Sequence, residues 1–485
     1  MIKRHLDVLL ILFLGILLYF PLFLHLQRMP IYIWDEARLA SNAIEMSITN
    51  DIIVTHYEGK PDLWNTKPPL LIWMQAGLIK LIGINELAIR LPSAIAGLIT
   101  CFALFFFLKR HTKNYWFGFI AALVLVTSQG YVGYHGTRTG DYDALLILFI
   151  TLFSFSFYNY LSIGKIIHFK LFFLYLTLAI LTKGIQPLIF LPGLLLIGFL
   201  NHKDSGIKFQ FKSTVFYSIF CIAVVAGYYF IRETQNPGYL KAVIENELGG
   251  RYLKTIESHD HGFTFYYDNI LNKQFNYWYL PMFIGVFIGL LNKNTTVKKL
   301  SIFCMILTLF YFLVISCAQT KLEWYDLPMF PFMAILCSIS IYELFLLVKH
   351  IPQFAERLKF NIAPYIILFF IFLFPYRAII DKVYFPKMYD YNNESIPFIL
   401  KNLPSEVKTC VICWDNGYGP QINFYITKLS KQNITCYYKY YKDLSPGDVA
   451  IASQEYEKEY IEANYKTTLL LERAAAKMYK IENRN

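Results

Sequence analysis

The sequence predicts a mainly α-helical, polytopic membrane protein that carries a small C-terminal α/β domain. Of its 485 residues, 56% are hydrophobic and only 16% are charged, whereas about 25% of residues are charged in soluble domains. The mean hydropathy is +0.40. Long apolar segments alternate with short loops rich in Lys and Arg, which is the pattern of cytoplasmic loops in multi-span proteins. These observations favour a helix bundle of about eleven spans.

Charge and cysteine content exclude two other classes of function. A net charge of +11 first suggests nucleic acid, but the basic residues fall mostly between apolar segments, so we expect membrane lipids and no nucleic acid as partners. Cys410 and Cys413 form a C-x-x-C motif in a strand-like run, where residues three apart point to opposite faces; we expect neither redox nor metal chemistry there. Five cysteines lie in apolar runs and are expected to be buried: Cys101, Cys221, Cys304, Cys317 and Cys337.

The first apolar segment, residues 8–26, follows a basic start and precedes no small-x-small cleavage site. We therefore expect an uncleaved span with a cytoplasmic N-terminus. Residues 29–87 then form an external loop with two short helices, at 36–48 and 70–82. The second helix has thirteen residues and reaches only ~20 Å, short of the ~30 Å hydrocarbon core, so it should lie along the membrane interface.

Alternate counting of the apolar segments places every short Lys/Arg-rich loop on one side of the membrane. The expected spans are 8–26, 87–108, 115–131, 142–161, 171–181, 185–200, 213–231, 277–291, 300–316, 327–348 and 362–374. Whether 171–181 and 185–200 each cross alone stays open. The predicted domains are a membrane domain, 1–375, and an extracytoplasmic α/β domain, 376–485. Strands of the second domain are expected at 407–414, 434–441, 448–453 and 467–471.

Ionisable residues gather at the outer ends of the predicted spans. They are Asp35, Glu36, Arg38, Lys67, Arg138, Asp141, Asp143, Arg251, Lys321, Glu323 and Asp326. Taken singly, each fits a solvated or snorkelling side chain as well as a functional one. As a set on one face they indicate a polar cavity, because charges at membrane depth are costly. Lys67 is expected in the first turn of the interfacial helix, where free N–H groups favour an anion such as phosphate.

A set of motifs in fixed order resembles the polyprenyl-phosphate-sugar glycosyltransferases, the group that contains protein O-mannosyltransferases and the lipid A aminoarabinose transferase. The motifs are Asp35-Glu-Ala-Arg38, Lys67-Pro-Pro-Leu70 with Trp73, Ala88-Ile-Arg-Leu-Pro-Ser93, Arg138-Thr-Gly-Asp-Tyr-Asp-Ala-Leu145, Thr182-Lys-Gly184, Gly250-Arg-Tyr252 and Lys321-x-x-x-Tyr-x-Leu-Pro328. Together they extend over most of residues 30–330. The resemblance implies the membrane GT-C fold, with an external first loop of two interfacial helices.

The resemblance also implies residue roles. Asp35 would be the catalytic base, and Arg38 and Lys67 would bind the donor phosphate. The lipid-phosphate site would also be lined by Arg251, Lys321 and Tyr325, and we add four residues to the substrate-binding set: Glu36, Arg138, Asp141 and Asp143. This chain departs from the pattern before the Lys-Pro pair, where relatives often carry an acid and Thr66 stands here.

The sequence therefore predicts an inverting glycosyltransferase of the bacterial inner membrane that works on the periplasmic side. It would move a sugar from polyprenyl phosphate, expected to be undecaprenyl phosphate, to a lipid, glycan or protein acceptor. The scheme needs no metal; a divalent ion at His259 and His261 is a less favoured alternative because the two lack further ligands at suitable spacing. The rival functions are a transporter or flippase of lipid-linked sugars, which tends to show paired repeats absent from this sequence, and a non-enzymatic membrane assembly subunit.

Overall fold

The computed structural model describes residues 2–205, 211–248, 261–351, 361–388, 390–414 and 417–485. The chain forms two compact units, each built from several segments. The helical unit comprises Met1–Leu24, Leu63–Leu71 and Leu91–Tyr384, and the mixed α/β unit comprises His25–Asp62, Ile72–Arg90 and Phe385–Asn485. The external loop after the first helix thus belongs largely with the C-terminal residues.

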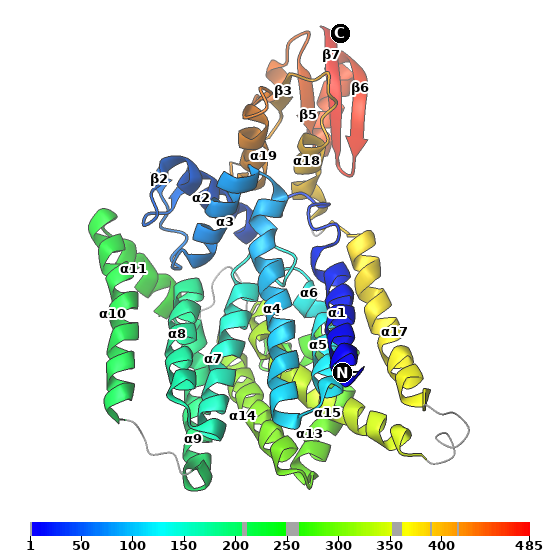
Figure 1. Ribbon diagram of the computed structural model, residues 1–485. Coiled ribbons are helices and arrows are strands. Elements are labelled where there is room, and N and C mark those ends of the chain that lie inside the picture. Colours follow the sequence, from blue (N-terminus) through cyan, green and yellow to red (C-terminus); the bar gives the residue numbers. More distant parts are fainter. Residues whose placement is uncertain (1, 206–210, 249–260, 352–360, 389, 415–416) are drawn as a thin grey trace. The chain divides into compact units, whose positions relative to one another are not determined.

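The helical unit is coloured from deep blue through cyan and green to yellow in Figure 1. Its helices are α1 (Ile2–Phe23), α4 (Glu86–Thr112, from Leu91 on), α5 (Tyr115–Val126), α6 (Gln129–Val132), α7 (Asp143–Ile163), α8 (Ile166–Lys183), η1 (Gln186–Phe190), α9 (Leu191–Ser205), α10 (Phe211–Gln235), α11 (Tyr239–Val243), η2 (Ile244–Leu248), α12 (Phe265–Asn269), η3 (Ile270–Gln274), α13 (Tyr279–Leu291), α14 (Thr295–Cys317), η4 (Glu323–Met329), α15 (Phe330–Lys349) and α17 (Ala363–Tyr384). Every apolar segment that the sequence predicts as a span is helical over most of its length.

The helical unit is that of a multi-pass membrane protein. Seven of the described helices are long and apolar enough to cross a membrane, or eight if the bent pair Phe265–Gln274 and Tyr279–Leu291 is one span. Four shorter apolar helices lie at Asp7–Phe23, Leu70–Ile82, Tyr115–Val126 and Gln186–Asn201. All of these except Leu70–Ile82 coincide with expected crossings.

Small residues and polar caps set how these helices begin, end and pack. The side chain of Asn114 accepts a hydrogen bond from the backbone N–H of Trp116 at the start of α5, and Asn294 does the same for Thr296 in α14. Helices α13 and α15 approach so closely that a Cβ on Gly285 would lie 1.9 Å from the carbonyl oxygen of Leu336. Helices α7 and α8 lie side by side (Figure 1).

The mixed unit begins with α2 (Asp35–Thr49), the short antiparallel pair β1 (His56–Tyr57) and β2 (Lys60–Pro61), and α3 (Leu70–Ile82). Both loop helices were predicted, and α3 has the predicted bounds. A five-stranded sheet follows in the order β4-β3-β5-β7-β6. Strand β3 runs parallel to both β4 and β5, and β7 runs antiparallel to both β5 and β6.

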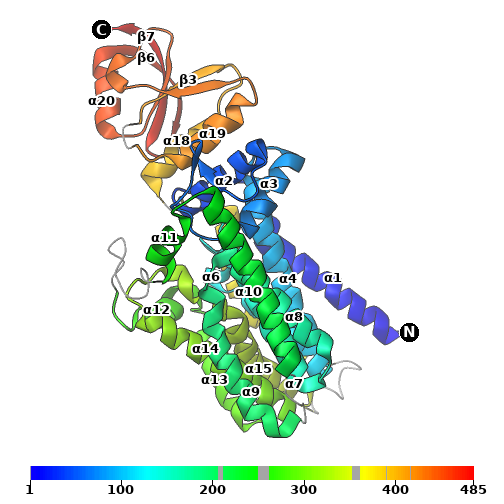
Figure 2. The ribbon, with the colours of Figure 1, turned by 90° about the vertical axis from the view of Figure 1, so that its left-hand side faces the viewer.

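The strands are β3 (Thr409–Ile412), β4 (Thr435–Tyr438), β5 (Val449–Ala452), β6 (Tyr465–Arg473) and β7 (Ala476–Arg484), and the helices among them are α18 (Tyr391–Lys401), α19 (Pro420–Ser430), η5 (Tyr441–Asp443) and α20 (Glu455–Asn464). Figure 2 shows the sheet together with α18, α19 and α20. Four strands match the predicted segments. The fifth strand, β7, was not predicted, because charged residues interrupt its alternation of apolar and polar side chains.

Three details of the sequence interpretation change. Cys410 and Cys436 occupy paired positions on β3 and β4 and form a disulfide, which the C-x-x-C reading does not predict. Cys317 is exposed, so its expected burial is wrong, whereas the other four cysteines of the apolar runs are buried. Helix α17 continues past 376 to Tyr384, and the mixed unit resumes at Phe385.

Candidate active site

A small cavity in the helical unit, whose wall is mostly apolar, gathers the two lysines that precede glycine or proline in the sequence motifs. It has a volume of about 140 Å³, and its lining includes Lys67, Lys183 and Tyr325 together with Glu247 of η2. The ammonium of Lys183 also lies 5.5 Å from the centre of the Tyr325 ring. Two cations and a phenol in one cavity are suited to bind an anion such as a phosphate.

Local structure explains how both lysines reach the cavity. Helix α8 ends at Lys183, because Gly184 turns the chain with a φ of +62°, a value that favours glycine. Lys67 does not lie in the first turn of the interfacial helix, as the sequence interpretation has it, because α3 begins only at Leu70. Its side chain instead pairs with Glu247, with Nζ 3.3 Å from Oε1.

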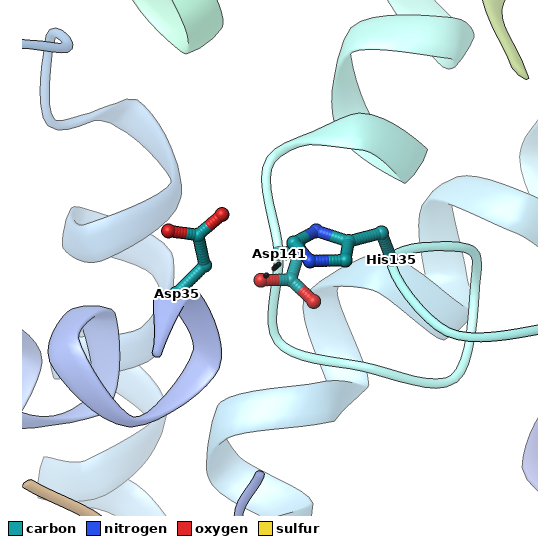
Figure 3. A group of neighbouring side chains, drawn as sticks. All are labelled: Asp35, His135 and Asp141. Carbon is teal, nitrogen blue, oxygen red and sulfur yellow. Dashed lines mark ion pairs between the residues drawn. The ribbon is translucent and has the colours of Figure 1, made fainter. Parts of the chain in front are cut away.

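A buried charge network continues from Lys183. Its Nζ donates a hydrogen bond of 2.6 Å to Oδ1 of Asp143. Nδ1 of His135 lies 3.8 Å from Oδ2 of Asp143 and 3.6 Å from Oδ1 of Asp141; Figure 3 marks the second pair with a dashed line. The His135 ring stacks on Trp324 at 3.6 Å. These charged groups are nearly inaccessible, so each depends on its partners for charge compensation.

His135, Asp141 and Asp143 are also the side-chain types that bind divalent metals. In this network, however, the ammonium of Lys183 already supplies a positive charge to Asp143. The sequence interpretation did not select His135. The only feature of the sequence that could have pointed to His135 is its position three residues before Arg138. It lies in a Gly-rich turn, where no hydrophobic periodicity indicates which way a side chain points.

A large apolar groove adjoins the Lys67–Lys183 cavity through Ile185, which lines both. The groove has a volume of about 860 Å³ and lies among α8, η1, α9, α10 and η2. Its lining consists mostly of Phe, Leu and Ile side chains, such as Phe173, Leu188 and Ile244. A cavity that holds two lysine side chains, next to a large apolar groove, is suited to an amphiphile with an anionic head and a hydrocarbon tail.

Arg138 and Lys321 both donate hydrogen bonds to backbone carbonyls. Arg138 donates to the carbonyl oxygens of Pro21 and Leu24 and so ties the end of α1 to its loop. Lys321 is buried and donates to the carbonyls of His261 and Ala318. Arg251 and His259 lie outside the described residues.

Of the other acids selected at the outer ends of the spans, Asp326 is buried and accepts a hydrogen bond of 2.8 Å from Asn269. Glu323 forms an exposed ion pair with Lys273. Neither acid is among the described residues that line the Lys67–Lys183 cavity.

The mixed unit holds Asp35, Glu36 and Arg38 on the first turn of α2. Glu36 is buried, and its two carboxylate oxygens accept hydrogen bonds from Nε and Nη2 of Arg90 at 2.7 and 2.8 Å. Arg90 also donates to the carbonyls of Leu26, Met29 and Pro30. In this geometry Glu36 supports the first turn of α2, which carries Asp35.

Arg38 is held from two sides. Its guanidinium forms a two-point contact with Asp62, at 2.9 and 2.8 Å, and lies 3.4 Å from the centre of the Tyr57 ring. Burial lowers the pKa of Arg38, but the hydrogen bonds and charge of Asp62 more than offset this, so its pKa is raised. Asp62 is a further residue that the sequence interpretation missed, because an acid 24 positions away gives no local signal.

Comparisons with known proteins concern the sequence family and the fold. The sequence model of the family described as dolichyl-phosphate-mannose-protein mannosyltransferase matches residues 66–229. A curated, uncharacterized protein of Aquifex aeolicus (strain VF5) is 24% identical over 318 residues. That alignment spans 65% of this chain and 60% of the relative, so the chain matches less than two thirds of the relative's length.

Two solved structures share the fold. ArnT from Cupriavidus metallidurans, bound to undecaprenyl phosphate, superimposes with a TM-score of 0.67 at 14% identity over 97% of each chain. The oligosaccharyltransferase of Archaeoglobus fulgidus gives a TM-score of 0.53 at 11% identity, over 96% of this chain and 69% of that chain. The chain has the membrane GT-C fold, as its motifs predict.

Proposed function

We propose that this protein is an integral-membrane, inverting glycosyltransferase that moves a sugar from a polyprenyl-phosphate carrier to an extracytoplasmic acceptor. The observation that carries the proposal is the pairing of the Lys67–Lys183 cavity with the apolar groove behind Ile185. The phosphate of the carrier would bind in the cavity and its isoprenoid tail in the groove. The similar ArnT structure holds undecaprenyl phosphate, which makes this lipid the expected carrier.

The chemistry assigns a role to each kind of residue. The acceptor oxygen attacks the anomeric carbon while the bond from that carbon to the phosphate oxygen breaks, which inverts the configuration. Asp35 takes the proton of the acceptor hydroxyl as general base. The departing phosphate gains negative charge, which Lys67, Lys183 and the Tyr325 hydroxyl stabilise. Because the leaving group is already an anion, no general acid and no metal is needed.

The proposal extends to location. The carrier lipid and the basic loops support a bacterial inner membrane protein with its active site on the periplasmic side. A disulfide in the mixed unit supports the same side, because disulfides persist in oxidising compartments. The membrane domain would extend to the end of α17 at Tyr384, and the α/β residues from Phe385 on would be extracytoplasmic.

Carrier binding and turnover by the purified full-length protein test the function. Synthetic undecaprenyl-phosphate sugar is the donor, and release of undecaprenyl phosphate is the readout. Lys67→Ala removes a charge-assisted contact of roughly 1.5–3 kcal/mol, so carrier binding should weaken about tenfold to hundredfold. Lys298→Ala, which changes an exposed lysine at the start of α14, is the matched control. A protein that binds the donor and moves it between vesicle leaflets without releasing the sugar would be a transporter instead.

A further inference from the structure

One face of α2 carries an aromatic and polar surface that the proposed chemistry does not use. Trp34, Arg38, Ser41 and Glu45 follow one another at spacings of four, three and four residues, which places them on one side of the helix. The row extends for roughly 16 Å. Asp35 stands at one end of it, beside Trp34. Helix α19 of the same unit packs against α2.

Trp34 is held in an unusual way for an exposed residue. Its side chain is 56% exposed, and its backbone has a φ of +72° and a ψ of −122°, a region that L-residues rarely adopt. The indole ring stacks on Tyr418, with centroids 5.2 Å apart and planes 24° apart. Strained residues cluster at ligand sites, where the surrounding structure holds them in place. Helix capping does not account for this tryptophan, because its side chain makes no capping hydrogen bond to α2.

The aromatic group continues toward Arg38. The Tyr418 and Tyr57 rings lie 6.5 Å apart, and the Arg38 guanidinium covers Tyr57. Burial raises the pKa of Tyr418 to about 12, so its phenol is a neutral hydrogen-bonding group at every physiological pH. Asp62 holds Arg38 at two points, so the surface has a fixed shape before any ligand arrives.

A cleft of about 220 Å³, lined by polar and apolar side chains, lies farther along α2 and shares Tyr57 with the aromatic group. It is lined by Ser41, Ile44, Glu45, Tyr57, Glu58, Asn423, Phe424, Ile426 and Thr427. The Asn423 amide donates to Glu58 and accepts a hydrogen bond from the Tyr438 hydroxyl, which fixes its orientation. Among these described lining residues two are acidic and none is basic.

Hydroxyls, carboxylates and an oriented amide beside aromatic rings are the groups that recognise a carbohydrate: the polar groups bond to sugar hydroxyls, and the rings cover the apolar face of the sugar. The volume is below the ~300–1,000 Å³ of pockets for drug-sized ligands, so it suits a single sugar residue. Two carboxylates without a basic partner in the lining disfavour phosphorylated or carboxylated sugars.

We propose that the Trp34–Tyr418 stack and the cleft between α2 and α19 bind a neutral or amine-bearing sugar of the acceptor. The acceptor role rests on the proposed function, since it takes this sugar to be the one presented to Asp35. The acceptor is then a glycan or the glycan part of a lipid. An unmodified protein side chain would have no use for a second sugar-binding surface.

The experiment uses full-length protein in nanodiscs on an array of neutral, amino-sugar and uronic-acid oligosaccharides. Wild type should bind neutral or amino-sugar probes and not the uronic-acid ones. Tyr418→Ala and Asn423→Ala should weaken this binding roughly three- to tenfold, the range of one aromatic contact or one hydrogen bond. Tyr440→Ala, an exposed tyrosine of the same unit outside the cleft, should bind as wild type.

Donor-side measurements separate this inference from the proposed function. Binding of undecaprenyl phosphate should be equal in wild type, Tyr418→Ala and Asn423→Ala, because the carrier cavity belongs to the helical unit. Two results would overturn the sugar surface alone, provided that carrier binding is normal. In the first, wild type binds no class of glycan selectively; in the second, the variants bind glycans as well as wild type does. Loss of carrier binding in wild type would overturn the glycosyltransferase. Impaired insertion of Tyr418→Ala into nanodiscs would make Tyr418 a membrane anchor and would also refute the inference.

Discussion

The carboxylate of Glu247 lies 3.3 Å from the ammonium of Lys67 and accepts a hydrogen bond of 2.8 Å from the hydroxyl of Thr66. Thr66 stands where relatives with this motif often have an acid. In this chain a carboxylate from η2, 181 positions away, therefore occupies the space beside residue 66. It also lines the cavity proposed for the donor phosphate. An anion already resides next to the lysine that the phosphate would need.

The first prediction is that Glu247→Gln strengthens binding of undecaprenyl phosphate. The carboxylate and the phosphate compete for Lys67, and the amide removes the charge while keeping the hydrogen bond from Thr66. At partial exposure we expect a gain of about threefold to tenfold in affinity. Titration of carrier into nanodisc-bound protein measures it, with Glu245→Gln, an exposed neighbour on the same short helix, as the control. Weaker binding would make Glu247 a necessary positioning residue.

Most helices of this protein could be predicted from local sequence patterns. Apolar runs predict the helices, and Lys-Pro-Pro before an apolar stretch with Gly83 behind it predicts α3 to the residue. The same reasoning places Asp143 at the mouth of α7. These predictions hold because hydrophobic periodicity and helix breakers act over a few residues.

The remaining part of the site depends on contacts between distant segments. Glu36 looks like a substrate ligand in its motif, and only the approach of Arg90, 54 positions away, shows that its oxygens are taken. The partners of Lys67 and Arg38, namely Glu247 and Asp62, carry no local signal. The disulfide of Cys410 joins strands rather than its C-x-x-C neighbour, because pairing of parallel strands decides which sulfurs meet.

The second prediction concerns the buried Lys183–Asp143 pair. Lys183→Met leaves the Asp143 carboxylate without its ammonium, which should cost about 3–5 kcal/mol of stability. Adding Asp143→Asn removes the stranded charge, so the double variant should recover most of the stability but not carrier binding. Thermal unfolding in detergent and carrier titration measure the two effects, and Lys170→Met, exposed on the same helix, is the control. Equal stability of Lys183→Met and wild type would show that the Lys183–Asp143 ion pair does not form in solution.

The third prediction is that two of the eight cysteines resist alkylation until the protein is reduced. In denaturant without reductant, maleimide should label six thiols, and after reduction all eight. Cys410→Ala should leave seven labelled thiols under both conditions, because Cys436 loses its partner. Mass spectrometry of the intact protein counts the labels. Eight labels without reductant would place the mixed unit in a reducing compartment.

The fourth prediction is that chelation leaves transfer largely intact. Lys67 and Lys183 stabilise the leaving phosphate in our scheme, and Lys183 compensates the charge of Asp143. Sugar transfer is therefore measured with EDTA and with added Mg²⁺, Mn²⁺ or Zn²⁺. Full loss on chelation, restored by one of these ions and abolished by His135→Ala, would turn His135, Asp141 and Asp143 into a metal site and replace our scheme.

The last prediction separates the proposed base from the phosphate contacts. Asp35→Asn keeps the size and position of the side chain on α2 but cannot take the proton of the acceptor. Turnover should fall by about 10²- to 10⁴-fold, the range of general-base contributions, while carrier binding stays unchanged. Asp443→Asn, an exposed acid of the same unit, should change neither. Turnover is followed as release of undecaprenyl phosphate, and carrier binding by titration. Normal turnover of Asp35→Asn would move the base to Asp141 or Asp143, each then tested by the same substitution. If Asp35→Asn and Lys67→Ala both left turnover and binding unchanged, the glycosyltransferase would have to give way to a transporter, because the general base and the phosphate cation are the two groups that sugar transfer requires.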